Sequence, residues 1–194
     1  GDFSIKYVAA NGQKMLNMGR FYYDVNTKQV VWDMRFPNKE VWVFRDTTQY
    51  IYRNDSLLRT ITSPMIVDLT VYHLSLHNDL SHYGLKNSVF YLDEVKEDNG
   101  MVISNWKTGK KMKIGHLSLS AKNKLLQGVI FYDTKDMIIR KQFFRNYKFI
   151  NGIPFPLEII DFFYNEGGKD IQKTTFKNIR INEMGYNPLY YYQR

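Results

Sequence analysis

The sequence predicts a mainly β protein that is built on one wide antiparallel sheet with one helical insertion. Three observations indicate this class: a high content of aromatic residues, turn signals at regular intervals, and apolar residues that alternate with polar ones. Aromatic residues make up 16% of the 194 residues, with 15 Tyr, 13 Phe and 3 Trp. Aromatic and β-branched residues favour strands, whereas a helical bundle would favour Leu and Ala.

Turn signals recur along the chain at the spacing of short strands. Asn or Asp beside Gly favours the tight two-residue turns that connect antiparallel neighbours. Runs rich in aromatic and β-branched residues fill the intervals, so we expect hairpin-connected strands. The turn signals are Asn11-Gly12, Pro37-Asn38, Arg53-Asn54-Asp55, Asp98-Asn99-Gly100, Thr108-Gly109, Lys122-Asn123-Lys124, Thr134-Lys135-Asp136, Asn151-Gly152 and Glu166-Gly167-Gly168.

The first predicted strands alternate apolar and polar residues. Every second residue of 19–25 and of 29–36 is apolar, so one face of each strand would turn toward a core and the other toward water. Residues 40–46 are apolar on both faces, and such a strand needs cover on both sides. The inward-facing residues of 19–25 and 29–36 are Phe21, Tyr23, Val25, Val30, Trp32, Met34 and Phe36.

Strand patterns also open the chain and fill its second half. The first strand is predicted over 3–8. The last four predicted strands follow one another as a long meander, because short turn signals separate them. The tyrosine-rich tail at 189–194 carries no predicted element. The later strands are predicted over 86–96, 100–106, 110–120, 125–132, 137–150, 155–164 and 170–181.

Residues 64–83 interrupt the strands with a helical pattern. Ser63-Pro64 is a favourable helix start, with Ser as the cap and Pro at the first position, and Gly84 is a suitable stop. The helix follows the fifth predicted strand, which contains Tyr50-Ile51-Tyr52. A sheet this wide must curl, split or close, and its concave face would bury the apolar stripe of the helix. The stripe consists of Leu69, Tyr72, Leu76, Leu80 and Tyr83.

The charge and composition limit the kinds of partner that the chain can have. Lys and Arg number 27 against 19 Asp and Glu, a net charge of +8. A basic chain attracts polyanions such as anionic lipid headgroups or nucleic acid, although a solubilising basic surface explains the charge equally well. The absence of cysteine excludes disulfides, thiol catalysis and Cys-based metal sites. No apolar run reaches the ~18 residues of a membrane span.

Catalytic and metal-binding motifs are missing. No nucleophile elbow, phosphate loop or dinucleotide fingerprint is present. His73 and His77 have the spacing of a zinc pair, with Asp79 or His82 as a third ligand, but no Glu occupies the position that a metalloprotease needs. We therefore expect no enzyme, no metal and no cofactor. A solvated face explains the acidic cluster of Asp93, Glu94, Glu97 and Asp98 better than acid–base work.

Several strand and turn motifs follow one another in order along the chain. They are Gly19-Arg20-Phe21-Tyr22-Tyr23, Val31-Trp32-Asp33-Met34-Arg35-Phe36-Pro37, Val41-Trp42-Val43-Phe44-Arg45-Asp46, Tyr50-Ile51-Tyr52, Ser63-Pro64-Met65 and Phe149-Ile150-Asn151-Gly152-Ile153-Pro154-Phe155-Pro156. In order and spacing the first five resemble the LolA family, with its strand, Trp-x-Met-x-x-Pro segment, aromatic-x-Tyr hairpin and Thr-Pro helix start. The last resembles the C-terminal meander of outer-membrane lipoprotein-sorting relatives. The resemblance extends from Phe3 to Ile181.

This resemblance implies one LolA-like domain over residues 1–194, an unclosed β-barrel with a helical lid over the concave face. It also implies a hydrophobic cavity for lipoprotein acyl chains or lipid, in a periplasmic or outer-membrane carrier or receptor. We expect a monomer in the periplasm, either free or lipid-anchored to the outer membrane. The chain begins with Gly1 rather than Met, so an export signal or anchor would have been removed.

Two features of the sequence depart from the family pattern. Val25-Asn26 stands where the family has Arg-Pro, whose arginine latches the helical lid. The chain also begins in a strand rather than in the long N-terminal helix of the family. These departures bear on the opening-and-closing mechanism of transfer more than on the fold.

The apolar residues of the first strands and of the helix are the candidate cavity wall. Burial of an acyl chain contributes about 0.8 kcal/mol per methylene, or roughly 11 kcal/mol for ~14 methylenes before ordering costs. The alternative is that these residues pack on one another, which would leave a filled shell that serves as a structural or interaction lipoprotein of the cell envelope. The predicted wall is Phe21, Tyr23, Val30, Trp32, Met34, Trp42 and Phe44, with Leu69, Tyr72, Leu76 and Leu80 from the lid.

Basic segments offer a further partner. The turn at 107–113 carries four lysines, which would meet lipid headgroups at the membrane surface or simply solubilise a hairpin. A nucleic-acid-binding β-module would need aromatics on the same face as the lysines. Here Phe21 and Trp32 lie on the apolar faces, so we expect no nucleic acid. The expected partners are acyl chains, with the membrane surface or an envelope protein as further candidates.

Overall fold

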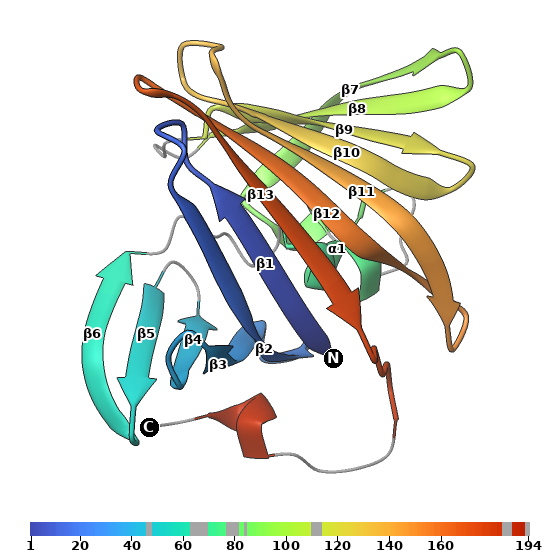
Figure 1. Cartoon of the computed structure of the whole chain (residues 1–194). Coiled ribbons are helices and arrows are strands. Elements are labelled where there is room, and N and C mark those ends of the chain that lie inside the picture. Colours follow the sequence, from blue (N-terminus) through green and yellow to red (C-terminus); the bar gives the residue numbers. More distant parts are fainter. Residues whose placement is uncertain are drawn as a thin grey trace.

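A computed structural model describes residues 1–45, 48–62, 70–76, 82–83, 85–109, 114–183 and 188–192. Thirteen antiparallel strands form one sheet in this part of the chain, as Figure 1 shows. Their lateral order is β6-β5-β4-β3-β2-β1-β13-β12-β11-β10-β9-β8-β7. The first and last strands of the chain pair in the middle, and β6 and β7 are two free edges, so the sheet does not close. The predicted class, a wide antiparallel sheet of a mainly β protein, is confirmed.

The elements have the following bounds. The strands are β1 (Asp2–Val8), β2 (Lys14–Asp24), β3 (Gln29–Phe36), β4 (Glu40–Arg45), β5 (Thr48–Arg53), β6 (Ser56–Thr62), β7 (Phe90–Asp98), β8 (Met101–Thr108), β9 (His116–Lys122), β10 (Leu125–Tyr132), β11 (Ile138–Ile150), β12 (Ile153–Asn165) and β13 (Gly168–Lys177). The helical elements are α1 (Val71–Leu76) and the 3₁₀ turns η2 (Leu85–Asn87) and η3 (Pro188–Tyr191).

Tight turns account for the regular strand order. Four hairpins turn on two central residues that both have positive φ, between 49° and 79°. This backbone twist matches the right-handed twist of the strands, and Asn and Gly tolerate it best. The four pairs are Asn54-Asp55, Asn99-Gly100, Asn123-Lys124 and Asn151-Gly152.

Two predicted elements differ from the structure. Strand β6 lies between the fifth predicted strand and the helix; it escapes prediction because all seven of its residues are exposed and it lacks alternation. Among the described residues of the predicted helix over 64–83, only α1 is helical, and Tyr83 lies in a turn with φ of 48°. The remaining parts, 63–69 and 77–81, lie outside the described residues, as does Gly84.

The core lies on the concave face of the sheet. Helix α1 packs there against β12 (Figure 1), and its residues 71–74 are buried. Strand β4 is covered on both sides, as predicted: Phe44 belongs to the concave core, whereas Val43 is 1% exposed in a separate outer cluster. Val31 belongs to the same outer cluster, so the prediction that this face of β3 meets water is wrong there. Phe36, predicted to face inward, is 45% exposed.

Candidate functional site

Strand register gathers the predicted wall residues on one patch of the concave face. Phe21 is paired with Trp32, and Trp32 with Trp42, across β2, β3 and β4. Two residues further along each strand, a second lateral row is formed by Tyr23, Val30 and Phe44. Met34 lies opposite Gly19, where an added Cβ would lie 2.2 Å from the Asp33 carbonyl oxygen, so only glycine permits this close approach of β2 and β3.

Helix α1 places its aromatic side chain on these rows. The ring of Tyr72 lies 4.6 Å from that of Phe21 and 6.1 Å from that of Tyr23. Leu76 packs at the edge of the same cluster. The contact between predicted wall and predicted lid is therefore present in the described part. The other two lid residues, Leu69 and Leu80, lie outside it.

The described wall residues form one packed cluster. Val30 is 0% exposed and Met34 2% exposed, and the Trp32 and Trp42 rings stack at 6.2 Å. Rings from distant strands complete the cluster, since Phe155 and Phe176 both contact Phe21. The structure thus brings together the nine described residues of the predicted wall and lid. Whether they contact a ligand stays a prediction.

One polar pair lies inside this apolar region. The Tyr23 hydroxyl is hydrogen bonded to Nδ1 of His73 at 2.6 Å, and His73 is 1% exposed. Burial of Tyr72 raises the pKa of its hydroxyl above the ordinary value. His73, which its spacing from His77 made a candidate metal ligand, is thus hydrogen bonded to Tyr23. No cluster of three potential metal ligands occurs within the described ranges, and His77 and Asp79 fall outside them.

The concave face continues beyond α1 as an uncovered apolar strip on β7 and β8. By register, Leu92, Val95 and Val102 share the face of the buried Trp106, yet they are 39%, 54% and 45% exposed. At the opposite edge, Ile61 of β6 lies across from Gln49 on the concave face and is 39% exposed. Both free edges of the sheet therefore present apolar side chains on their concave side.

Sequence reasoning missed this strip for a geometric reason. The register of β7 and β8 shifts between Leu92 and Glu94, so an extra residue separates Leu92 from Val95. In a regular strand, residues three apart lie on opposite faces, but the extra residue of the bulge brings Leu92 and Val95 onto the same face. A shift in alternation beside two acidic residues was the available signal.

A buried charge pair marks the far part of the concave face. Asp161 is 2% exposed and accepts hydrogen bonds from Arg140 Nε at 2.8 Å and from Gln142 Nε2 at 3.1 Å. Register places Gln142 opposite Asp161, both on the concave side. Burial raises the pKa of the Asp161 carboxyl above 3.8 and outweighs the opposing effect of Arg140.

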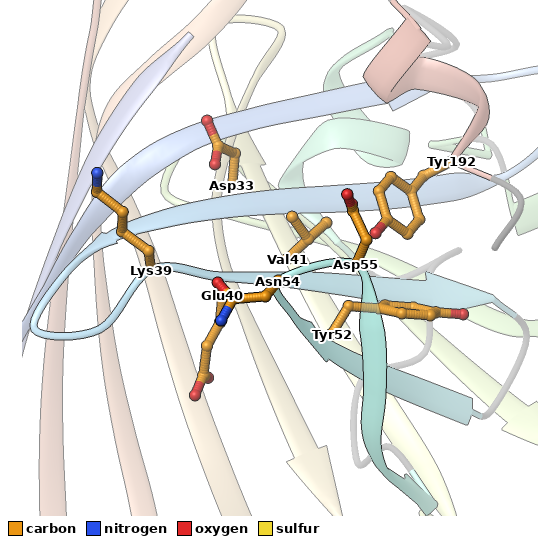
Figure 2. Close-up of a pocket in the computed structure, with 8 residues that line it drawn as sticks. All are labelled: Asp33, Lys39, Glu40, Val41, Tyr52, Asn54, Asp55 and Tyr192. Carbon is orange, nitrogen blue, oxygen red and sulfur yellow. The ribbon is translucent and has the colours of Figure 1, made fainter.

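A small hollow lies on the outer face of β3–β5, beside the C-terminal tail (Figure 2). Its volume is 170 Å³, below the ~300 Å³ of a typical small-ligand site. Asp33, Asp55 and Tyr192 surround it, as Figure 2 shows. Its polar lining and small size do not suit an acyl chain, so the concave face remains the candidate site.

The tail itself covers this outer face. Arg45 donates a hydrogen bond through Nη2 to the Tyr192 carbonyl and another through Nε to Gln29 Oε1 at 2.6 Å. Gln29 in turn donates to the carbonyls of Tyr190 and Tyr192. The Tyr192 ring lies 4.9 Å from that of Tyr52 in the outer cluster. The tail that the sequence left unassigned is thus the outer cover that β4 required.

Comparisons with known proteins give the fold a context. Neither a protein-family model nor a curated protein matches the chain. Solved structures do. A LolA superfamily protein from Nitrosomonas europaea superposes with a TM-score of 0.66 at 9% identity, over 95% of this chain and 86% of that one. The chain has the LolA-type fold.

Two further structures share this fold. A DUF1329 family protein from Desulfovibrio piger has a TM-score of 0.64 at 15% identity, over 97% of this chain and 88% of that one. An outer membrane lipoprotein-sorting protein domain from Vibrio parahaemolyticus has a TM-score of 0.62 at 12% identity, over 97% and 89%. Within the described residues, no helix has the length and hydropathy to cross a membrane.

Proposed function

We propose that this protein carries or receives lipoprotein acyl chains or lipid, which bind against the concave face of the sheet. The uncovered apolar strip of Leu92, Val95 and Val102 is the observation that carries the proposal. Three apolar side chains that are roughly half exposed on one concave face lose hydration when an apolar ligand covers them. The LolA-type fold supports the same ligand class.

The proposed binding surface runs from the strip toward the packed aromatic cluster. Leu92 and Val102 lie beside the buried Trp106 and Ala121 in the register of β7–β9. An acyl chain that starts on the strip would reach the cluster under α1 only if Tyr72 and its neighbours move. The strip is therefore the first contact, and the aromatic cluster is the region that would open.

The remaining features of the proposal keep the expectations drawn from the sequence. We propose a periplasmic, non-catalytic protein that acts as a monomer. Its fold neighbour in Vibrio parahaemolyticus is an outer membrane lipoprotein-sorting domain, which supports this location.

Titration with a fluorescent fatty acid tests the proposal. We expect saturable binding by the wild type, and a loss of about tenfold or more for Val95→Glu, because a carboxylate at this position would have to be desolvated by the bound chain. Tyr91→Glu is the matched control: Tyr91 lies on the same strand, is also 54% exposed, and faces the outer side by register. Equal affinities of the two variants would contradict binding at the strip.

A second candidate function is a filled shell that works through its outer surface in the cell envelope. The dense packing of the predicted wall favours it, since Val30, Met34 and Tyr72 are each at most 5% exposed. In that case the wild type would bind no fatty acid, and the strip would be a contact for another protein.

A further inference from the structure

The outer face of the central strands carries a basic and aromatic surface on which no described element packs. We name it the basic outer patch and define it as Lys6, Lys141, Lys169, Lys173, Phe143 and Phe162. These residues belong to β1, β11, β12 and β13, which lie side by side in the middle of the sheet (Figure 1). Helix α1 lies on the concave side, and the C-terminal tail covers only the neighbouring outer face.

Register places the patch in two adjacent lateral rows. In one row Lys6 is opposite Lys173, which is followed by Ile160 and Phe143. In the next row Ile171 is followed by Phe162 and Lys141. Cations and apolar side chains therefore lie next to one another across four strands, and Phe143 is 36% exposed.

The positive charge of the patch is mostly uncompensated. Lys173 pairs with Glu158 at 2.6 Å. Within the described residues, no carboxylate lies within ion-pair distance of Lys6, Lys141 or Lys169. Lys6 and Lys173 are moreover direct cross-strand partners, and like charges in this position oppose folding. An external anion would relieve that repulsion.

Lysine ammonium groups lie over the aromatic rings of this face. Lys169 Nζ lies 5.1 Å from the centre of the Phe162 ring, and Lys141 Nζ lies 5.8 Å from that of Tyr164. The Phe143 ring meets Phe162 edge-on at 6.0 Å. Cations and aromatic rings thus lie together on this face, as at a membrane interface.

We propose that the basic outer patch docks the protein on an anionic phospholipid surface. Lys6, Lys141 and Lys169 supply the attraction to headgroup phosphates, and the apolar side chains of the patch supply contact with the interfacial region. Single-stranded nucleic acid fits less well, since base stacking needs open ring faces and lysines occupy those of Phe162 and Tyr164. The proposal does not depend on acyl-chain binding, because the patch lies on the opposite side of the sheet.

Of the four lysines in the predicted basic turn at 107–113, the structure describes Lys107 alone. Lys107 pairs with Asp93 at 2.9 Å, so its charge is compensated. The other three lysines of that turn lie outside the described residues.

Co-sedimentation with vesicles tests the proposal. The protein should bind vesicles that contain phosphatidylglycerol and dissociate from them at high salt. It should not bind vesicles of pure phosphatidylcholine. Each lysine near such a surface contributes roughly fivefold to partitioning, so the triple variant Lys6→Gln, Lys141→Gln, Lys169→Gln should bind about 100-fold more weakly. Circular dichroism and thermal unfolding establish that the variant is folded.

A matched triple variant separates the patch from general basicity. Lys39→Gln, Lys86→Gln and Lys122→Gln remove the same charge from exposed positions elsewhere. Retained binding by this control supports the patch. Equal losses in both triple variants, binding to neutral vesicles, or full displacement by a single-stranded oligonucleotide would overturn the proposal.

Discussion

Strands β2–β5 are covered on both faces, but by different means. On the concave side α1 contributes rings and apolar side chains, with Tyr72 packed on Phe21 and Tyr23. On the outer side the Tyr192 ring packs on Tyr52, and Gln29 and Arg45 also donate hydrogen bonds to the carbonyls of residues 190 and 192. The concave cover therefore depends mainly on shape and burial, whereas the outer cover adds directional hydrogen bonds to the tail backbone.

This difference gives the two faces different physical properties. Apolar contacts are non-directional, so an acyl chain could replace the apolar contacts of α1, although the Tyr23–His73 hydrogen bond would be lost. Displacing the tail would leave Gln29, 6% exposed, without its carbonyl partners, which is costly for a buried amide. We therefore expect the concave side to be the face that opens when a ligand binds, and the outer side to stay closed.

The largest expected effect is on the concave side. Tyr72→Ala should lower the free energy of unfolding by about 3–5 kcal/mol, because it leaves a ring-sized cavity among Phe21, Tyr23 and Phe176. Urea denaturation measures this. The outer counterpart, Val43→Ala, should cost about 2 kcal/mol. A larger loss at Val43 than at Tyr72 would contradict the view that α1 is the principal apolar cover.

The hydrogen bonds of Arg45 that hold the tail should contribute less to the free energy of unfolding. Arg45→Ala should cost about 1–2 kcal/mol, since it removes hydrogen bonds from a charged group to Gln29 and to the Tyr192 carbonyl. Arg35→Ala is the control, because Arg35 forms only an exposed pair with Asp33 and should cost under ~1 kcal/mol. In a chain truncated before residue 188, the cost of Arg45→Ala should shrink; an unchanged cost would show that Arg45 acts elsewhere.

The Tyr23–His73 hydrogen bond under α1 should contribute about 1 kcal/mol to the free energy of unfolding. Tyr23→Phe removes the hydroxyl that bonds His73 and leaves the ring in place. Denaturation of Tyr23→Phe and of Tyr22→Phe, the neighbour on the outer face, compares the two sides. No loss in Tyr23→Phe would mean that the pair does not hold α1 to the sheet.

The smallest effect is a pH dependence at Asp161. Because the folded-state pKa of Asp161 is raised above 3.8, its contribution to stability is complete below that pH and is lost as pH rises through the folded-state pKa. Relative to Asp161→Asn, the wild type should therefore lose stability over this range. Denaturation midpoints at several pH values measure the difference, and a relative gain would show that attraction to Arg140 outweighs burial.

The sequence predicted the elements whose pattern is local. Alternation in 19–25 and 29–36 identified Phe21, Tyr23, Val30, Trp32 and Met34 as one face, and turn residues identified most hairpins. The two apolar faces of β4 predicted cover on both sides, but the sequence did not identify the tail as the outer cover. The hydrogen bonds from Gln29 and Arg45 that fix the tail end on its backbone carbonyls, which carry no sequence signal. In β7 the bulge hid the shared face of Leu92 and Val95, and β6 had no alternation to recognise.

Native mass spectrometry of the purified protein, followed by organic extraction, tests the central claim most directly. Acyl-chain binding on the concave face predicts a lipid or fatty acid at close to one per chain, which Val95→Glu reduces and Tyr91→Glu retains. A protein that is empty and takes up no added fatty acid would contradict the claim. It would leave a LolA-type shell whose concave face is filled by its own aromatic side chains.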